Sequence, residues 1–229
     1  MKKVVVFTGS GVSAESGLKT FRDSDGLWEN YRIEEVATPQ AWQRNRAMVL
    51  EFYNQRRKQV LDAQPNAAHL ALAKLESVYD VQIITQNIDD LHERAGSTKV
   101  LHLHGEIRKS RSSVDPALVY EIQGAEIREG EKCGRGSQLR PHIVWFGEMV
   151  PELSNAVQLV SRAELFIVIG TSLLVYPASG LVDYAPREAE KYFIDPMPSE
   201  QAGNQFTIIN EKAGTCVPRL VENLLKRKV

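Results

Sequence analysis

The chain has 229 residues, and its 28 Lys and Arg residues nearly balance its 29 Asp and Glu residues, which gives a formal net charge of −1 at pH 7. Hydrophobic residues make up 43% and charged residues 25%, the usage of an ordinary globular protein, so a disordered, collagen-like or disulfide-stapled chain is excluded. The near-neutral net charge also gives no indication of nucleic-acid binding.

The first predicted element is a strand. After Met1-Lys2-Lys3, the apolar run Val4–Phe7 stops at Thr8-Gly9, which is too short for a signal peptide or a membrane span. The only two cysteines, Cys133 and Cys216, are far apart in the sequence, which fits a reducing compartment. We therefore expect a cytoplasmic protein that contacts neither membrane nor nucleic acid.

Similar short apolar runs, rich in β-branched residues, recur along the chain. They do not alternate with polar residues, which is typical of strands buried on both faces. The runs are Val4–Phe7, Val81–Thr85, Val100–Leu103, Ile143–Phe146, Leu165–Ile169, Tyr192–Ile194 and Phe206–Ile209. Helical patterns separate several of them, among them residues 69–75 and 217–228. This alternation predicts an α/β fold with a Rossmann-like, doubly wound parallel sheet.

Two stretches interrupt the alternation. Residues 39–63 have the pattern of one charged helix, whose candidate buried positions are Trp42, Met48, Val49, Phe52 and Val60. Residues 106–140 are polar and glycine-containing, with weak periodicity. We expect residues 1–28, 64–105 and 141–229 to form the Rossmann-like domain. Residues 29–63 and 106–140 would form a smaller inserted domain.

The turn after the first strand, Gly9 to Ala14, matches the dinucleotide pattern G-x-G-x-x-G/A. Glycines there allow a tight turn and a close approach of the backbone to a pyrophosphate, although a purely structural turn is the alternative. Dehydrogenases also need an acidic residue about twenty positions on, at the end of a second strand, to hold the ribose. Here that region has Asp23 and Asp25 without a strand, so ordinary hydride transfer is disfavoured.

Together with later motifs, this turn resembles the sirtuins, a family of NAD-dependent protein-lysine deacylases. The resemblance begins with Gly9–Gly17, Thr20-Phe21-Arg22 and Gly26-Leu27-Trp28. It continues, in the order of the family, with Thr85–His92, Leu103-His104-Gly105, Leu139-Arg140-Pro141, Val144–Glu148, Gly170–Leu173 and Ile209-Asn210. It therefore extends from the first strand to the last helix, and it implies a Rossmann-like domain with a small inserted domain.

The chemistry of this family requires a general base. Nicotinamide leaves the ribose, the acyl-lysine oxygen attacks in its place, and a base then activates a ribose hydroxyl; imidazole suits that task near pH 7. The resemblance implies that His104 is the base. His102 is the alternative, because it is expected on the same strand and on the same side. The other histidines, His69, His92 and His142, are expected to be structural.

The resemblance also assigns the residues around NAD. Asn87 would act with His104 by binding the ribose and an ordered water, and Asp89 would accept from the nicotinamide carboxamide. The same segment can simply be a strand-to-helix turn, with Asp90 as the helix cap. The residues assigned to NAD are Gly9, Ser10, Gly11, Ser13, Ala14, Glu15, Thr20, Phe21, Arg22, Trp28, Gln86, Asn87, Ile88, Asp89, His104, Gly170, Thr171, Ser172, Asn210, Glu211, Lys212 and Cys216.

The acyl-lysine substrate is assigned to Val144, Trp145, Phe146, Gly147 and Glu148 in the same way. The resemblance implies removal of the acyl group from lysine side chains of proteins, with release of nicotinamide and O-acyl-ADP-ribose, and we expect a monomer. Two other functions remain open at this point, a non-catalytic NAD-binding sensor and an ADP-ribosyltransferase.

The sequence departs from the family at its metal site. Most sirtuins hold a structural zinc ion with two Cys-x-x-Cys pairs in the small domain, a closed site of four thiolates. Here Lys109–Val114 contains no cysteine, and Cys133 is followed by Gly136 at the partner position. One cysteine cannot hold a structural zinc ion, so we expect no metal and a small domain held by packing and hydrogen bonds.

Tyr53 and Arg56 suggest which acyl group is removed. Residues three apart lie on one face of a helix, and a phenol beside a guanidinium forms a receptor for a carboxylate. The pair resembles that of the desuccinylase and demalonylase branch of the sirtuins. The alternative is an arginine-rich solvated helix, with Arg56 as one more arginine beside Arg44, Arg46 and Arg57.

Overall fold

The computed structural model describes residues 1–20, 27–28 and 31–227. Its centre is a six-stranded parallel sheet with the strand order β11-β10-β9-β1-β4-β5. The strands are β1 (Lys3–Thr8), β4 (Asp80–Thr85), β5 (Val100–His102), β9 (Leu165–Ile169), β10 (Glu190–Ile194) and β11 (Thr207–Ile209). The predicted Rossmann-like sheet is confirmed.

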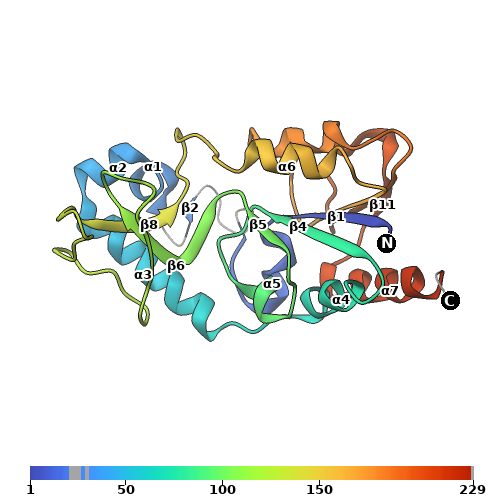
Figure 1. Ribbon diagram of the computed structural model, residues 1–229, viewed down its shortest axis with the longest axis horizontal. Helices are drawn as coiled ribbons and strands as arrows, with labels where there is room; N and C mark the ends of the chain where they lie inside the picture. Colours follow the sequence, from blue (N-terminus) through green and yellow to red (C-terminus); the bar gives the residue numbers. More distant parts are fainter. Residues whose placement is uncertain (21–26, 29–30, 228–229) are drawn as a thin grey trace.

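Helices cover both faces of this sheet (Figure 1). Helices α4 (Ala67–Leu75) and α7 (Ala213–Lys226) lie on one face, and α6 (Leu153–Val160) with the 3₁₀ helix η3 (Ala178–Tyr184) lies on the other. Strand β1 explains why the apolar runs do not alternate. Val4 and Val6 pack toward α4 and α7, whereas Val5 and Phe7 pack toward α6, so every residue of the run is buried.

A smaller part of the molecule lies at one end of this sheet (Figure 1). It has a three-stranded antiparallel sheet of order β7-β6-β8, built from β6 (Gly105–Ser112), β7 (Val119–Glu121) and β8 (Leu139–Ile143). The other elements near it are the ribbon β2 (Leu27–Trp28) with β3 (Tyr31–Arg32), and the helices α1 (Ile33–Val36), α2 (Pro39–Arg44) and α3 (Arg46–Asp62). The short helix α5 (Leu91–Arg94) follows β4, and the 3₁₀ helix η4 (Glu200–Gln205) precedes β11.

Two expectations about this part are wrong. The single helix expected over residues 39–63 is two helices, because Asn45 leaves the helical conformation and its side chain caps α3 by accepting from the Met48 N–H. The run Ile143–Phe146 is not a strand of the parallel sheet. Strand β8 ends at Ile143 and pairs antiparallel with β6.

Helix α3 is tied to the small sheet by Arg57. The alternative interpretation of this helix has Arg57 solvated, but Arg57 is fully buried and donates to the backbone oxygens of Ile107 and Ala125 and to the Asn54 side chain. Burial lowers the pKa of Arg57 to about 10, which leaves the guanidinium charged at neutral pH. A buried cation held by carbonyl groups therefore fixes α3 against the strands.

Candidate active site

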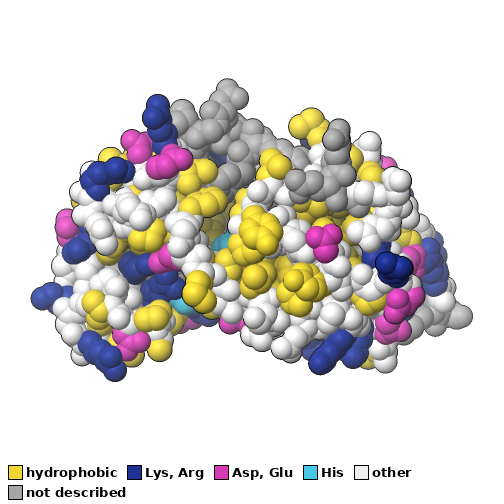
Figure 2. Space-filling model, turned by 90° about the horizontal axis from the view of Figure 1, so that it is seen from above, with side chains coloured by type: hydrophobic (Ala, Val, Ile, Leu, Met, Phe, Trp, Pro, Cys, Tyr) yellow, Lys and Arg dark blue, Asp and Glu magenta, His cyan; other side chains and the backbone are white. Residues whose placement is uncertain are grey.

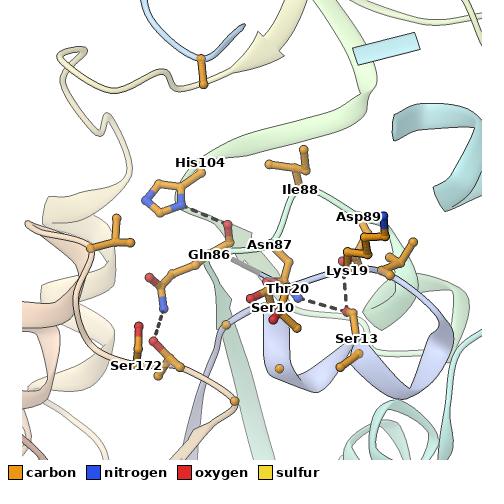
Figure 3. A pocket seen from close by; sticks show the side chains of 18 of the residues that line it. Ser10, Ser13, Lys19, Thr20, Gln86, Asn87, Ile88, Asp89, His104 and Ser172 are labelled. Carbon is orange, nitrogen blue, oxygen red and sulfur yellow. Dashed lines mark hydrogen bonds between the residues drawn. The ribbon is translucent and has the colours of Figure 1, made fainter. Parts of the chain in front are cut away.

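A pocket of about 720 Å³ lies where the carboxyl ends of β1, β4 and β9 meet the smaller part of the molecule. In the space-filling view the surface is hollowed between the two parts, and hydrophobic side chains line the hollow (Figure 2). Ligands of open α/β sheets bind at such an edge. The segments that follow these three strands supply much of the lining (Figure 3).

Glycines let two of these segments touch through their backbones. The Gly11 N–H donates to the Gly170 oxygen over 2.9 Å, and a Cβ added at Gly11 would lie 2.7 Å from Gly170 Cα. Gly170 itself has a φ of 62°, a conformation that favours glycine. The turn after β1 and the turn after β9 are therefore locked together, and both line the pocket.

Asn87, Ser13 and Asp89 form a hydrogen-bonded group on the floor of the pocket (Figure 3). The Asn87 Nδ2 atom donates to Ser13 Oγ over 3.1 Å, and Ser13 Oγ donates to Asp89 Oδ2 over 3.1 Å. Asp90 is the N-cap residue of α5, as expected, but its side chain makes no capping hydrogen bond; Asp89 Oδ1 accepts from the Leu91 N–H instead. Burial raises the pKa of Asp89.

Two buried histidines support this group from behind. The His69 Nδ1 atom lies 3.3 Å from the Asn66 N–H and must accept, so its Nε2 carries the proton and faces Ser13 Oγ at 3.5 Å. His92 Nε2 lies 3.1 Å from the Thr8 hydroxyl, and the two imidazole rings meet edge to face at 4.8 Å. Burial lowers the pKa of His69 to about 4 and that of His92 well below its ordinary value, so both rings are neutral.

His104 is the imidazole that lines the pocket. Its Nδ1 atom lies 3.0 Å from the backbone oxygen of Gln86 and donates to it (Figure 3), so the neutral ring carries its lone pair on Nε2. Burial lowers the pKa of His104, which favours the neutral form at pH 7.

His102 differs from His104 in both position and partners. Strand β5 ends at His102, so the expectation that the two lie on one strand is wrong, and of the two only His104 lines the pocket. His102 Nδ1 lies 3.0 Å from the Asn87 oxygen and Nε2 lies 2.8 Å from Glu93. Burial opposes protonation, but the hydrogen bond and the charge of Glu93 raise the pKa of His102 overall. Both ring nitrogens of His102 are thus engaged.

Helix α3 contributes part of the pocket lining. Tyr53 and Arg56 lie on the face expected from their spacing, both are buried, and both line the pocket. The Trp145 indole N–H donates to the Tyr53 hydroxyl oxygen over 3.1 Å. Burial raises the pKa of Tyr53, so the phenol stays protonated. A positively charged and a neutral donor residue therefore lie one helical turn apart in the lining of the pocket.

The segment Val144–Glu148 forms one wall. The Val144 N–H donates to the His104 oxygen over 2.9 Å, and the Phe146 N–H donates to the Ala37 oxygen over 3.0 Å. Glu148 accepts two hydrogen bonds from Arg140 and one from the Trp145 N–H. Burial would raise the pKa of Glu148, but Arg140 lowers it overall, so the carboxylate is ionised. This wall is fixed both to the loop of His104 and to the small sheet.

Most of the residues predicted for the site line this pocket, but some do not. Among the described residues, Asn210, Glu211 and Cys216 are outside its lining; Cys216 is buried in the core beside α4. Phe21 and Arg22 lie outside the described residues, and of Trp28 only the backbone is described. Residues of the lining that the sequence analysis missed include Leu18, Ala37, Val60, Tyr176, Asp195 and Met197. Asp195 directly follows β10, so its place at a strand end was the available signal.

The predicted loss of the zinc site concerns Cys133. Its Sγ atom lies 3.1 Å from Ser137 Oγ, which lies 2.8 Å from Ser112 Oγ. The Ser112 hydroxyl in turn accepts from the N–H groups of Val114 and Asp115. Over residues 1–20, 27–28 and 31–227 the structure has no group of three or more His, Cys, Asp or Glu side chains arranged to hold a metal ion.

No helix among the described residues has the length and apolar character that crossing a membrane requires.

The sequence matches the family model described as Sir2 family over residues 9–177. A protein of Bacteroides thetaiotaomicron named NAD-dependent protein deacylase is 55% identical over 231 aligned positions, covering 98% of this chain and 99% of that protein. A Helicobacter pylori protein of the same name is 52% identical, and the alignment covers 99% of this chain and 99% of that protein.

Two solved structures are also similar to this chain over nearly its whole length. A Sir2 homologue in complex with NAD superposes with a TM-score of 0.89 at 42% identity, covering 100% of this chain and 91% of that one. A mutant Sir2 homologue in complex with ADP-ribose superposes with a TM-score of 0.91 at 42% identity, covering 99% of this chain and 93% of that one.

Proposed function

The chain belongs to the Sir2 family and is an NAD-dependent protein deacylase, and we propose that it prefers lysine side chains carrying a short dicarboxylic acyl group, such as succinyl or malonyl. The observation that carries this preference is the pair Tyr53 and Arg56, both buried and both lining the pocket. A guanidinium offers a fork of donors and a phenol adds one more, which matches a carboxylate.

The lining of the pocket fits NAD. The hydroxyl groups of Ser10, Thr171 and Ser172 lie at the strand ends and suit the hydroxyls and phosphates of a dinucleotide, and Asn87 and Asp89 suit a ribose and a carboxamide. When bound, NAD supplies a ribose carbon that the acyl oxygen can attack and nicotinamide as the leaving group. The remaining tasks belong to the side chains of this chain.

We assign the general base to His104. Because the Nδ1–H group donates a hydrogen bond to the Gln86 oxygen, Nε2 is the atom that takes a proton from a ribose hydroxyl. Asn87 is held by Ser13, so its amide is oriented before any ligand binds. Residues 144–148 are assigned to the acyl-lysine chain, which would pass between their loop and His104.

The acyl preference is tested by Arg56→Met, which keeps the length and apolar contact of the side chain. A charge-assisted hydrogen bond contributes about 1.5–3 kcal/mol, so kcat/KM for a succinyl-lysine peptide should fall about ten- to hundredfold while the acetyl-lysine value changes by less than about threefold. Arg46→Met is the matched control, since Arg46 lies on the same helix over the Trp42 ring and outside the pocket lining. Equal loss on both peptides, or a wild-type preference for acetyl-lysine, would contradict the proposal.

The assignment of the base is tested by His104→Ala. The variant should still bind NAD but should not form acyl-ADP-ribose at a significant rate with an acyl-lysine peptide, because the base acts after nicotinamide has left. If the wild-type protein binds NAD without releasing nicotinamide from any acyl peptide, a sensor function replaces turnover. If ADP-ribose appears on a protein acceptor instead of on the acyl group, transfer replaces deacylation.

We also propose the domain division and the monomeric state expected from the sequence. Residues 1–28, 64–105 and 141–229 would fold as one unit and residues 29–63 and 106–140 as the other. Light scattering of the purified protein checks the monomer, and limited proteolysis between the units checks the boundaries.

A further inference from the structure

The side chain of Trp145 is clamped from two sides and is almost completely buried. The Arg140 guanidinium carbon lies 3.3 Å from the centre of the Trp145 ring, and the Trp42 ring lies 5.7 Å away at an angle of 41°. Arg140 is itself held by Glu148, which also accepts from the Trp145 backbone N–H over 2.8 Å. One carboxylate thus fixes both the backbone of Trp145 and the cation stacked on its ring.

The hydrogen bond between Trp145 and Tyr53 can have only one direction. An indole N–H donates and cannot accept, so the Tyr53 oxygen is the acceptor over the 3.1 Å contact. The hydrogen of the phenol must then point away from the indole. Burial raises the pKa of Tyr53, which keeps that hydrogen on the oxygen over the physiological pH range. Tyr53 is therefore set as a donor in a direction that Trp145 determines.

Tyr53 also borders the pocket in which we propose that the ligand binds. Tyr53 and Arg56 lie one turn apart on α3, and both line the same pocket as Trp145. The Tyr53 ring meets the Phe52 ring edge to face at 5.0 Å and lies 6.5 Å from the Trp145 ring, which in turn contacts Trp42.

We propose that Trp145 is a positioning residue for acyl selectivity: its indole N–H holds the Tyr53 oxygen so that the phenol hydrogen is directed at the distal carboxylate of the acyl chain, beside Arg56. This inference rests on the proposed preference for dicarboxylic acyl groups. Trp145 does not touch the reacting atoms in this role, and its contribution passes through Tyr53. A residue that only packs in the core would support every acyl substrate equally.

The test is Trp145→Phe, which keeps an aromatic ring under Arg140 and removes the N–H donor. We expect the ratio of kcat/KM for a succinyl-lysine peptide to kcat/KM for an acetyl-lysine peptide to fall about three- to tenfold, the range of a single neutral hydrogen bond. Tyr53→Phe should lower this ratio at least as far. The double variant Trp145→Phe/Tyr53→Phe should be no worse than Tyr53→Phe alone, because Trp145 acts through Tyr53.

Trp42→Phe is the matched control, because it removes an indole from the same aromatic cluster through a ring contact with Trp145. It should leave the ratio of succinyl to acetyl activity unchanged. Equal loss on both substrates in Trp145→Phe, or a double variant whose losses multiply, overturns the positioning role.

An NMR measurement on proteins that keep Trp145 tests the inference even if Trp145→Phe misfolds. The ¹H–¹⁵N resonance of the Trp145 indole, assigned by its absence from that variant, should shift in Tyr53→Phe and on addition of succinyl-lysine peptide with NAD. An indole resonance that Tyr53→Phe leaves in place overturns the inference. Arg56→Met separates the proposed acyl preference from the role of Trp145. If Arg56→Met leaves the ratio of succinyl to acetyl activity unchanged, the proposed preference fails. If Arg56→Met changes this ratio and Trp145→Phe does not, only the role of Trp145 fails.

Discussion

The Nδ1 atom of His104 lies 3.0 Å from the backbone oxygen of Gln86, and the imidazole can make this contact only as a donor. The bond fixes the tautomer of His104 and leaves Nε2 as the basic atom inside the pocket. Since Gln86 directly follows β4 and its side chain also donates to Thr171 after β9, the position of the base is set by two strands of the central sheet.

The first prediction concerns pH. A general base must be unprotonated, and burial lowers the pKa of His104 below its ordinary value of about 6.5. We therefore expect kcat/KM to be retained as the pH falls through about 6.5 and to decline only at lower pH, with a slope of one proton. Replacement of His104 by Ala should lower kcat by about 100- to 10,000-fold. His142→Gln is the control, because His142 does not line the pocket. An acidic limb that starts above about pH 7 would contradict the assignment.

The second prediction concerns stability in acid and the buried ring of His69. Its pKa is lowered to about 4 in the folded chain, mainly by burial, while the unfolded value is about 6.5. The unfolded chain therefore binds a proton first as the pH falls, so the stabilisation is complete above about pH 6.5 and is lost toward about pH 4. For this single group the loss is at most about 3 kcal/mol.

Urea unfolding at a series of pH values measures this effect. The free energy of unfolding of the wild-type protein should fall more steeply between about pH 6.5 and about pH 4 than that of His69→Gln, which has no titrating side chain at position 69. His142→Gln is the matched control, since its half-buried ring should contribute less. Parallel pH curves for the wild type and His69→Gln would mean that His69 is not buried as a neutral ring in solution.

The parts of the site that the sequence predicted are those that follow strands. Gly11, Asn87 and Thr171 each come directly after a buried apolar run, and parallel strands bring their carboxyl ends to one edge. The sequence could not separate His102 from His104 by geometry, because that depends on where β5 ends and on the Glu93 side chain, nine residues away. Only the motif favoured His104.

The smaller part of the molecule was less predictable because its order depends on contacts distant in sequence. Strand β6 pairs with β8, about thirty residues later, across a polar segment without a clear period. The Arg57 side chain looked solvated beside its charged neighbours, yet it is buried against carbonyl groups that come from residues 107 and 125. Neither feature has a local signature in the sequence.

The third prediction concerns metal. Where two cysteine pairs would hold zinc in most sirtuins, hydrogen bonds link Cys133, Ser137 and Ser112. Purified protein should contain well under one equivalent of zinc, and incubation with a chelator should change neither the deacylation rate nor the melting temperature. Elemental analysis and thermal unfolding measure both. Stoichiometric zinc that is lost together with the melting transition would overturn this prediction.

A variant tests the same cluster directly. Ser112→Ala removes the hydroxyl that accepts from the N–H groups of Val114 and Asp115 and that contacts Ser137. Because Ser112 is buried, about 1–3 kcal/mol of stability should be lost while the acyl preference stays unchanged. Ser113→Ala, at an exposed neighbouring position, is the control and should have no measurable effect.

The last prediction concerns the contact between Gly11 and Gly170. A Cβ on residue 11 would lie 2.7 Å from Gly170 Cα and 2.9 Å from the Gly170 oxygen, and both are backbone atoms that cannot swing aside. Gly11→Ala must therefore push the turn after β1 away from the turn after β9 and break the 2.9 Å hydrogen bond between them. Both turns line the NAD pocket, so the affinity for NAD should fall at least about tenfold, and the strain of about 1–3 kcal/mol should lower the melting temperature by several degrees. Gly134→Ala is the matched control, since its Cβ would meet only the Tyr120 hydroxyl at 3.7 Å, an ordinary contact. Calorimetric titration with NAD and thermal unfolding of both variants provide the measurement. If Gly11→Ala binds NAD as tightly as Gly134→Ala does, the close approach of the two turns is not what shapes the site.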